Sequence, residues 1–198
     1  MTSEQQTGYD LSGFPKVLWL RNGARATLRP MVSADEPELL AFFLRVPEED
    51  RRYLKDDVTS PEVIRRWARE IDYSNVLPIL AEVEGRIVAD ASLHRSPQPY
   101  RPHSAEVRVV VDPSFRTMGL GVEMARELIS LAKQANLQDV YFELAEEGEA
   151  AAVRAAKRLG FTDAALYMRR RRDQIGEPFD LLIMELHLHE QEIHVRGS

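Results

Sequence analysis

Apolar residues recur along the chain with two spacings, one typical of strands and the other of helices. Runs in which apolar residues alternate with polar ones, or are continuous, predict strands. These runs are residues 26–29, 76–83, 86–93, 105–111, 140–144, 162–168 and 179–188. Apolar residues three or four positions apart predict helices. These stretches lie within residues 34–46, 61–71, 119–135 and 149–159.

Turn and cap signals separate these elements. Asn22-Gly23 is typical of a two-residue turn, and Glu84-Gly85 joins two strand-like runs into a predicted hairpin. Ser33, with Glu36 three residues later, matches the capping-box pattern and predicts the start of the first helix. Residues 17–20 are either a further short strand or an apolar anchor for the N-terminal segment.

The order of the elements predicts the fold class. It indicates an α/β (α+β) domain with a mixed, mostly antiparallel central sheet of about six or seven strands, flanked by about four helices. A length of 198 residues suits one domain. We expect an N-terminal arm over residues 1–20, one domain over 21–188 and a flexible tail over 189–198.

Charge and composition narrow the function classes. The net charge is −6, and an acidic chain is a poor general binder of nucleic acid. The chain has no cysteine, which excludes disulfides, thiolate zinc sites and cysteine nucleophiles. No apolar run approaches the roughly 18 residues that span a bilayer, and residues 1–10 lack the features of a signal peptide. We therefore expect a cytoplasmic protein with no membrane or nucleic-acid partner.

The stretch 107–121, VRVVVDPSFRTMGLG, carries the clearest functional signal. An apolar strand ends at Asp112-Pro113, and Arg-x-x-Gly-x-Gly then leads into a helix. Glycines let a backbone approach a ligand closely, and the N–H groups of a helix N-terminus bind anions such as a diphosphate. A plain strand–helix connection also accommodates the two glycines. A dinucleotide-binding fold does not fit, because Met124 stands where its third glycine belongs.

This motif resembles the core motif of the GNAT superfamily of acyl-CoA-dependent N-acetyltransferases, and the likeness extends over residues 20–188. Segments at 28–30, 52–54 and 105–107 further resemble the catalytic domain of Pat-type bacterial protein-lysine acetyltransferases. The resemblance implies a GNAT-like fold and acetyl-CoA as co-substrate. The cofactor-binding residues that it implies are Val109, Val110, Val111, Arg116, Thr117, Met118, Gly119, Leu120, Gly121 and Val122.

Acetyl transfer to an amine requires a base that accepts the ammonium proton. Strand alternation places Glu106, Arg108 and Val110 on one face of their strand. From these residues alone, Glu106 is either a base or a carboxylate paired with Arg108. In Pat-type domains the glutamate of Ala-Glu-Val is the proposed base, and the resemblance implies the same catalytic role for Glu106.

Two positions depart from the superfamily pattern. Glu149 stands where many members have an asparagine, and Ala156 stands where they have a tyrosine that acts as acid to the leaving thiolate. Tyr141, Tyr167 or water could substitute. The departures are compatible with a glutamate base, and they also leave open a non-catalytic module that binds or senses acyl-CoA.

Other charged groups bear on the partners. The run Arg169–Arg172 is either a solvated strand end or a contact for a phosphate, an acidic patch or RNA. His187 and His189 share a strand face but lack a third ligand, so we expect no metal. The charged loop 47–59 is mostly acidic and suits a cationic amine.

The sequence thus predicts an N-acetyltransferase that moves an acetyl group from acetyl-CoA to a primary amine, with protein lysine as the leading acceptor. A small-molecule amine acetyltransferase is the second enzymatic hypothesis. The sequence leaves open the acceptor's identity, the acyl-chain preference and whether the chain forms a homodimer.

Overall fold

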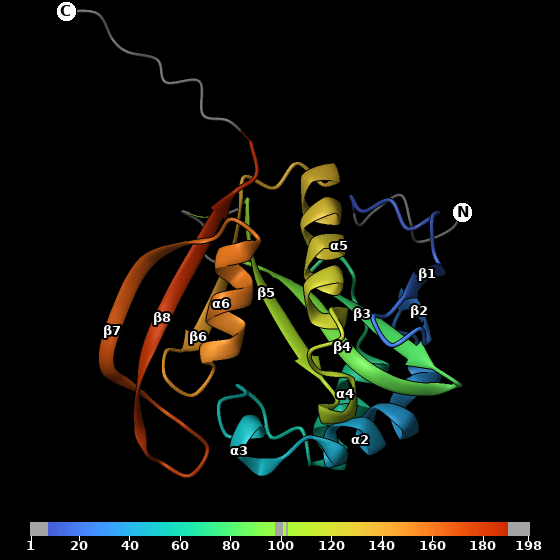
Figure 1. Ribbon diagram of the computed structural model, residues 1–198, viewed down its shortest axis with the longest axis horizontal. Coiled ribbons are helices and arrows are strands. Elements are labelled where there is room, and N and C mark those ends of the chain that lie inside the picture. Colours follow the sequence, from blue (N-terminus) through green and yellow to red (C-terminus); the bar gives the residue numbers. More distant parts are fainter. Residues whose placement is uncertain (1–7, 98–100, 102, 190–198) are drawn as a thin grey trace, which may run out of the picture.

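One eight-stranded sheet runs through the molecule in the order β1-β2-β3-β4-β5-β6-β8-β7 (Figure 1). The computed structural model describes residues 8–97, 101 and 103–189, and within them every side chain except that of Arg170. All neighbouring strands are antiparallel except β5 and β6, which are parallel. The strands are β1 (Lys16–Trp19), β2 (Arg25–Pro30), β3 (Val76–Val83), β4 (Arg86–Arg95), β5 (Ser104–Val111), β6 (Asp139–Ala145), β7 (Thr162–Arg172) and β8 (Pro178–His187).

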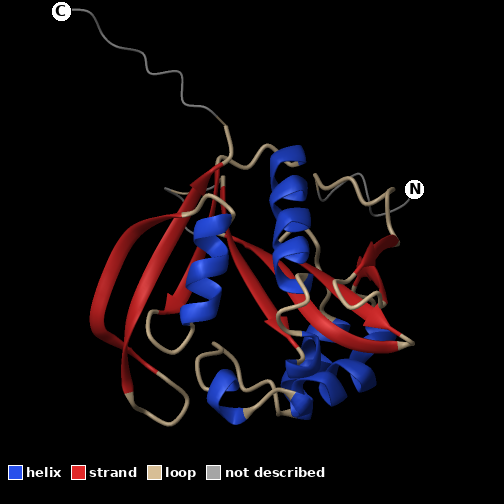
Figure 2. Ribbon diagram, viewed as in Figure 1, coloured by secondary structure: helices blue, strands red, loops and turns tan. Residues whose placement is uncertain are grey.

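Helices cover both faces of this sheet (Figure 2). They are α2 (Glu36–Arg45), α3 (Glu48–Arg51), α4 (Pro61–Arg69), α5 (Leu120–Gln134) and α6 (Ala150–Arg158), with 3-10 turns at η1 (Ser33–Asp35) and η2 (Pro113–Phe115). On one face α5 buries Leu120, Met124 and Leu128, which are four residues apart and therefore share a side of the helix. On the other face Phe42 of α2 and Ile64 of α4 pack over β3 and β4. Each such side chain contributes about 1.5–3 kcal/mol of burial free energy.

The predicted fold class is confirmed, with one strand more than expected. Residues 16–19 form β1 and pair with β2 across the Asn22-Gly23 turn. Tyr9 and Leu11 are buried in the core, so the described part of the expected arm, residues 8–20, packs onto the domain. Of the expected tail, only His189 lies within the described residues.

The first helix begins differently from the predicted capping box. Ser33 makes no capping hydrogen bond, and residues 33–35 form the 3-10 turn η1 instead. The buried carboxylate of Asp35 accepts the backbone N–H of Val32 at 2.7 Å. Arg29 of β2 donates to both Asp35 oxygens, at 2.6 and 2.7 Å. A charge-assisted pair from a neighbouring strand therefore replaces the local serine cap, because ionised partners bond more strongly than a hydroxyl.

Replacing Asp35 with Asn is expected to lower the free energy of unfolding by about 1–3 kcal/mol at neutral pH. Burial raises the pKa of Asp35, but Arg29 and the Val32 N–H together lower it below its ordinary value. The contribution of the carboxylate is therefore present above the unfolded pKa and is lost as pH falls through the lower folded pKa. Urea unfolding at several pH values should show the Asp35→Asn deficit shrinking in acid.

Asp163→Asn is the matched control for this prediction. Asp163 pairs with Lys157 at 3.1 Å, but both side chains are half exposed. Exposed pairs contribute about 0–1 kcal/mol, so this substitution should change the unfolding free energy little. An equal loss in the two variants would contradict the structural role assigned to Asp35.

The sheet opens between β5 and β6, and this opening positions the functional site. The two strands pair only through residues 104–106 and 139–141, with Glu106 opposite Tyr141 at the last pair. Beyond that pair they run apart (Figure 1), while β5 stays paired with β4 as far as Val111. Within the described residues, the edge of β5 from 107 to 111 that faces β6 has no strand partner. Apart from the Val111 carbonyl, which accepts a hydrogen bond from Arg116, its backbone groups are therefore without ladder hydrogen bonds and available to a ligand.

Candidate active site

Residues 117–122, here called the cradle, connect β5 to α5 and present backbone N–H groups of the kind that suit an anion. Gly119 is the residue before α5 and has φ of 90°, a left-handed conformation that favours glycine. Thr117 is also left-handed, with φ of 62°. The first helical hydrogen bond of α5 runs from the Glu123 N–H to the Gly119 carbonyl. The N–H groups at 120–122 therefore have no intrahelical acceptor, and the positive end of the helix dipole adds to their attraction for an anion.

Gly121 lets α5 lie close to β5. A Cβ at this position would be 3.2 Å from Val111 Cγ2 and 3.6 Å from Val109 Cγ1. Both valines pack on the α5 face of the sheet, whereas Val110 packs on the α2 and α4 face. This is the alternation predicted from the sequence. Gly121 therefore brings the start of α5 close to the C-terminal end of β5.

Ion pairs tie the segment before the cradle to the helices on the opposite face. Arg116 donates to the Val111 carbonyl at 3.2 Å and pairs with Asp50 of α3 at 2.7 Å. Asp112 is buried, accepts the Ser114 N–H and pairs with Arg45 of α2 at 3.0 Å. Arg116 thus links the end of β5 to α3.

Glu106 lies at the point where the sheet divides, and it is buried. Its carboxylate accepts hydrogen bonds from Lys55 Nζ and Arg108 Nη2, both at 2.8 Å. Burial raises the pKa of Glu106, but Arg108 and Lys55 together lower it below its ordinary value. The carboxylate is therefore ionised at neutral pH and can accept a proton or a hydrogen bond. The sequence left two roles for Glu106, a base or a carboxylate paired with Arg108. The pairing with Arg108 is observed, and an ionised carboxylate in this position is still able to act as a base.

A polar hollow of about 500 Å³ lies beside Glu106. Its lining includes His94 of β4, Arg108 of β5, Tyr141 of β6 and Lys55. Burial is the main cause that lowers the pKa of His94 to about 4, so its imidazole is neutral at pH 7. The hollow can therefore hold a polar acceptor group beside an ionised carboxylate.

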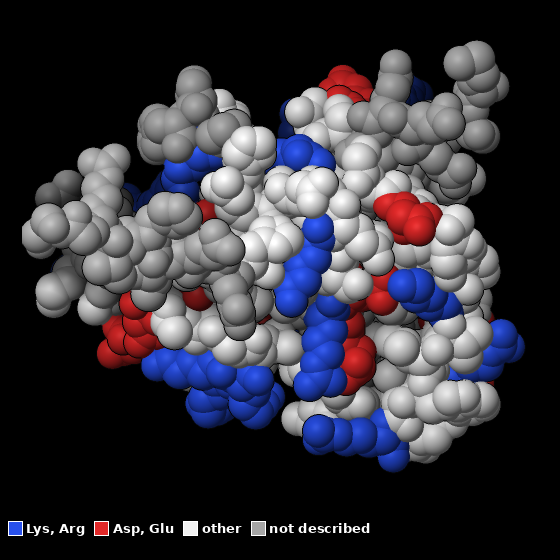
Figure 3. All heavy atoms as spheres, turned by 90° about the horizontal axis from the view of Figure 1, so that it is seen from above, with Lys and Arg blue, Asp and Glu red and all other residues white. Residues whose placement is uncertain are grey.

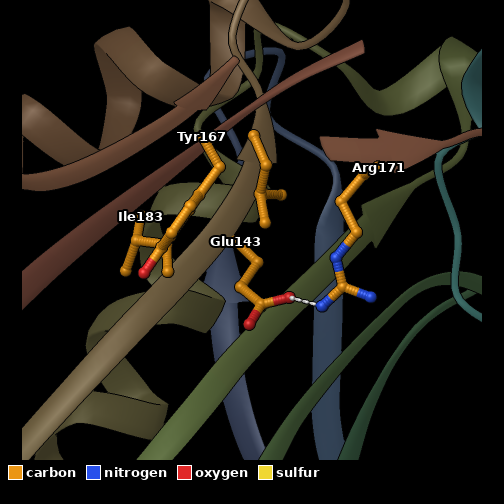
Figure 4. A pocket seen from close by; sticks show the side chains of 5 residues that line it. Glu143, Tyr167, Arg171 and Ile183 are labelled. Atoms are coloured by element: carbon orange, nitrogen blue, oxygen red, sulfur yellow. Dashed lines mark ion pairs between the residues drawn. The ribbon is translucent and has the colours of Figure 1, made fainter. Parts of the chain in front are cut away.

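A second carboxylate lies across the opening of the sheet. Glu143 of β6 lines a smaller hollow of about 260 Å³ together with Tyr167 and Ile183 (Figure 4). Arg171 of β7 points toward Glu143, with 3.6 Å between the charged groups (Figure 4). Glu143 was not among the candidates chosen from the sequence. Its signal was a lone carboxylate in an apolar strand, two residues from Tyr141 and therefore on the same face.

Lys55 joins the two carboxylates. Its Nζ atom lies 2.8 Å from Glu106 and 2.8 Å from Glu143 Oε2, so one ammonium bridges β5 and β6 where they separate. From the sequence, Lys55 was only one of the charges in a polar loop. In the structure its ammonium lies between Glu106 and Glu143.

The two positions that depart from the superfamily pattern have structural roles in α6. Glu149 precedes the helix and accepts the Ala145 N–H at 2.7 Å, and burial is the main cause that raises its pKa to about 7. Ala156 is buried in the core. Of the tyrosines considered as substitutes, Tyr141 lies opposite Glu106 and Tyr167 lies in the hollow beside Glu143.

The arginine run belongs to β7, and Arg169, Arg171 and Arg172 make different contacts. Arg171 approaches Glu143, whereas Arg172 donates to the Gly176 carbonyl at the hairpin tip. The backbone N–H of Arg169 donates to Asp180. On the face seen in Figure 3, Lys and Arg side chains lie interspersed with Asp and Glu side chains.

The histidines near the C-terminus form no metal centre in the described part of the chain. No group of three metal-ligating side chains is close enough to hold a metal ion among residues 8–97, 101 and 103–189. His187 pairs with Asp139, and the third histidine near the C-terminus lies outside the described residues. Among the same residues, no helix is long and apolar enough to cross a membrane.

Comparison with known proteins identifies one family. Residues 40–161 match the sequence profile of the Acetyltransferase (GNAT) family. Among solved structures, yncA of Salmonella typhimurium, solved with its cofactor acetyl-CoA, has a TM-score of 0.71 and 20% identity, covering 87% of this chain and 98% of that one.

Two further structures show the same fold at low identity. The ribosomal-protein-alanine N-acetyltransferase of Brucella melitensis has a TM-score of 0.69 and 24% identity, covering 81% of this chain and 98% of that one. The GNAT domain of S. lividans PAT has a TM-score of 0.69 and 17% identity, covering 86% and 96%. The Pat-type domain is thus one of several similar structures, and the finer subfamily prediction stays a prediction.

Proposed function

We propose, from the premise that this chain belongs to the acetyltransferase (GNAT) family and uses acetyl-CoA as co-substrate, that it transfers the acetyl group to a primary amine, with protein lysine as the leading acceptor. The observation that carries this proposal is the position of Glu106. An ionised, buried carboxylate lies at the point where β5 and β6 separate, beside a polar hollow.

The cradle fits the co-substrate. Its diphosphate matches the N–H groups at 117–122, where the left-handed Gly119 leaves room for close approach. Its pantetheine arm matches the unpaired edge of β5 at 109–111, which offers backbone groups in the manner of an added strand. The bound co-substrate supplies an activated acetyl thioester. We assign Val109, Val110, Val111, Arg116, Thr117, Met118, Gly119, Leu120, Gly121 and Val122 to its binding.

Glu106 serves as the base in this proposal. An acceptor ammonium that enters the hollow meets an ionised carboxylate and gives up its proton, either directly or through one water molecule. Lys55 and Arg108 stabilise the ionised form of Glu106 before the amine arrives. Loss of one of these cations on acceptor binding raises the proton affinity of the carboxylate, because a nearby positive charge favours ionisation.

Two carboxylates that already hold an ammonium support an amine acceptor in this proposal. Glu106 and Glu143 present two carboxylates toward one ammonium, which is the arrangement that Lys55 displays. Two further carboxylates, Asp50 and Asp56, lie in the segment between α2 and α4 that carries Lys55. A lysine side chain carries its cation on a narrow apolar stem and suits this site.

A panel of amines tests the proposal. We expect acetyl-CoA to release free thiol in step with acetylation of lysine-containing peptides. Small polyamines and α-amino peptides should react more slowly if protein lysine is the acceptor. Faster reaction of a small amine than of every peptide would favour the small-molecule hypothesis.

The same assay separates an enzyme from a sensor. Calorimetry measures acetyl-CoA binding without an acceptor. Binding without thiol release for any amine in the panel would favour the non-catalytic acyl-CoA module, which the absence of the usual tyrosine at Ala156 keeps as an alternative. No acetyl-CoA binding would contradict the assigned cradle.

A further inference from the structure

Lys55 occupies the position that the proposed reaction requires of an acceptor amine. Its Nζ atom is 2.8 Å from the proposed base, Glu106, and equally close to Glu143 on the other side of the opening. Both carboxylates are largely buried, with side-chain exposures of 7% and 15%. The lysine therefore enters the site as an incoming substrate side chain would, with its charged end innermost.

The choice of lysine at this point is unusual for this chain. Of its 26 lysine and arginine residues, 22 are arginines and only four are lysines, namely Lys16, Lys55, Lys133 and Lys157. Arginine forms the other ion pairs of the site, at Arg108 and Arg171. Arginine cannot lose its proton in a protein, whereas a lysine amine can and then becomes a nucleophile. The cation between the two carboxylates is thus one that can react.

The segment that carries Lys55 is held in place from two sides. On one side, Gln174 at the β7–β8 hairpin tip donates to the carbonyls of Leu54 and Asp56, at 3.2 and 2.8 Å. Arg52 donates to the buried carboxylate of Asp173 at 2.6 Å. The residues on either side of Lys55 are therefore fixed to the same hairpin.

On the other side, Tyr53 packs against the loop between β6 and α6. A Cβ at Gly148 would lie 2.5 Å from Tyr53 Cε2, so only the absence of a side chain at 148 allows this contact. The Tyr53 ring also meets Phe179 edge-on, with 5.4 Å between centroids. Holding a nucleophile beside its base in this way replaces a collision between molecules with a reaction inside one molecule.

The geometry points to Lys55 as a self-modification site: the protein transfers an acetyl group from bound acetyl-CoA to its own Lys55 Nζ. This inference rests on the proposed function, since it uses the same co-substrate and Glu106. Glu106 takes a proton from the Lys55 ammonium, and the freed amine forms a C–N bond with the acetyl carbon. The C–S bond then breaks, and the sulfur leaves with the bonding pair. The nitrogen loses its second proton in the same step, and this proton passes to the sulfur to give the free thiol. The products are acetyl-lysine and free thiol.

Acetylation changes the site as well as marking it. The amide carries no charge, so Glu106 and Glu143 lose their shared cation. The Lys55 side chain then no longer competes with the ammonium of an external acceptor for binding to the two carboxylates. Self-acetylation is therefore expected to increase the access of a cationic acceptor to the two carboxylates.

Peptide mapping after incubation of the full chain with acetyl-CoA tests this inference. We expect Lys55 to be acetylated roughly 100-fold or more faster than Lys157, because of its fixed position. The rate constant should not change with protein concentration, as an intramolecular step requires. Lys157 is the matched control, since it pairs with a carboxylate, Asp163, but is half exposed.

Two variants separate the failure of this inference from the failure of the proposed function. Glu106→Gln should abolish acetylation at Lys55 and leave the slow background at Lys157 unchanged. Lys55→Arg should bind acetyl-CoA in calorimetry with the affinity of the original chain. Acetyl transfer to external amines without modification of Lys55 would overturn the inference alone. A Lys55 rate equal to that of Lys157, or one proportional to protein concentration, would overturn it too.

Discussion

Replacing Glu106 with Gln is expected to lower the rate of acetyl transfer by about 10²- to 10⁴-fold at neutral pH, which is the usual contribution of a positioned base. The amide keeps the size and a hydrogen-bond acceptor of the carboxylate but cannot take the ammonium proton. Acetyl-CoA affinity should stay unchanged, because the cradle lies at 117–122, beyond the opposite end of β5. Steady-state thiol release and calorimetry on the two proteins measure both quantities.

Glu82→Gln is a suitable control for this substitution. Glu82 is a partly buried strand carboxylate that also pairs with an arginine, Arg29, but it lies on β3 away from the opening between β5 and β6. Its rate should be close to that of the original chain. A Glu106→Gln rate within a few-fold of the original would remove Glu106 as the base.

The pH dependence provides a second check on Glu106. The pKa of Glu106 is lowered, so its carboxylate is ionised throughout the neutral range. It loses its charge only when the pH falls below the ordinary pKa of a glutamate. His94 has its pKa lowered to about 4 and stays neutral there. The acceptor enters as an ammonium and gives its proton to a carboxylate that is already ionised, so the rate should change little between about pH 6 and 9. An inflection near neutral pH that disappears in His94→Gln would assign the base to the histidine.

Replacing Gly119 with Trp is expected to weaken acetyl-CoA binding by about 10- to 100-fold or more. The indole would fill the space over the N–H groups at 120–122, and each charge-assisted hydrogen bond lost costs about 1.5–3 kcal/mol. The left-handed φ of 90° also disfavours any side chain at this position. Calorimetric titration with acetyl-CoA measures the loss.

Gly85→Trp controls for the backbone effect in this prediction. Gly85 has a similar φ of 78° and lies in the β3–β4 turn, where a Cβ would meet no atom within 4 Å. Both substitutions therefore carry a similar conformational cost, measurable by thermal unfolding. Only Gly119→Trp should lose affinity, and an equal loss in the two variants would place the diphosphate elsewhere.

Local signals predicted the turn between β5 and α5 and much of the fold. Gly119 was recognisable because the preference of glycine for a left-handed turn is local and does not depend on distant residues. The face on which Glu106 and Arg108 lie followed from strand alternation. The hairpin at β3 and β4 was predicted from the Glu84-Gly85 turn, and the structure confirms it.

Features that depend on distant residues were not predictable in this way. Asp35 displaced Ser33 as the cap because Arg29 of a neighbouring strand pairs with it. The meeting of Lys55 with Glu106 and Glu143 joins three segments that are far apart in the sequence, and it also depends on the hairpin tip at Gln174. No spacing rule along one element connects such residues.

A crystal structure of the protein with acetyl-CoA tests the central claim most directly. We expect the diphosphate on the N–H groups at 117–122 and the pantetheine arm along β5 at 109–111. We also expect the acetyl group in the opening between β5 and β6, within reach of Glu106. Acetyl-CoA bound with its thioester away from Glu106, or with its diphosphate outside the cradle, would contradict the proposed mechanism.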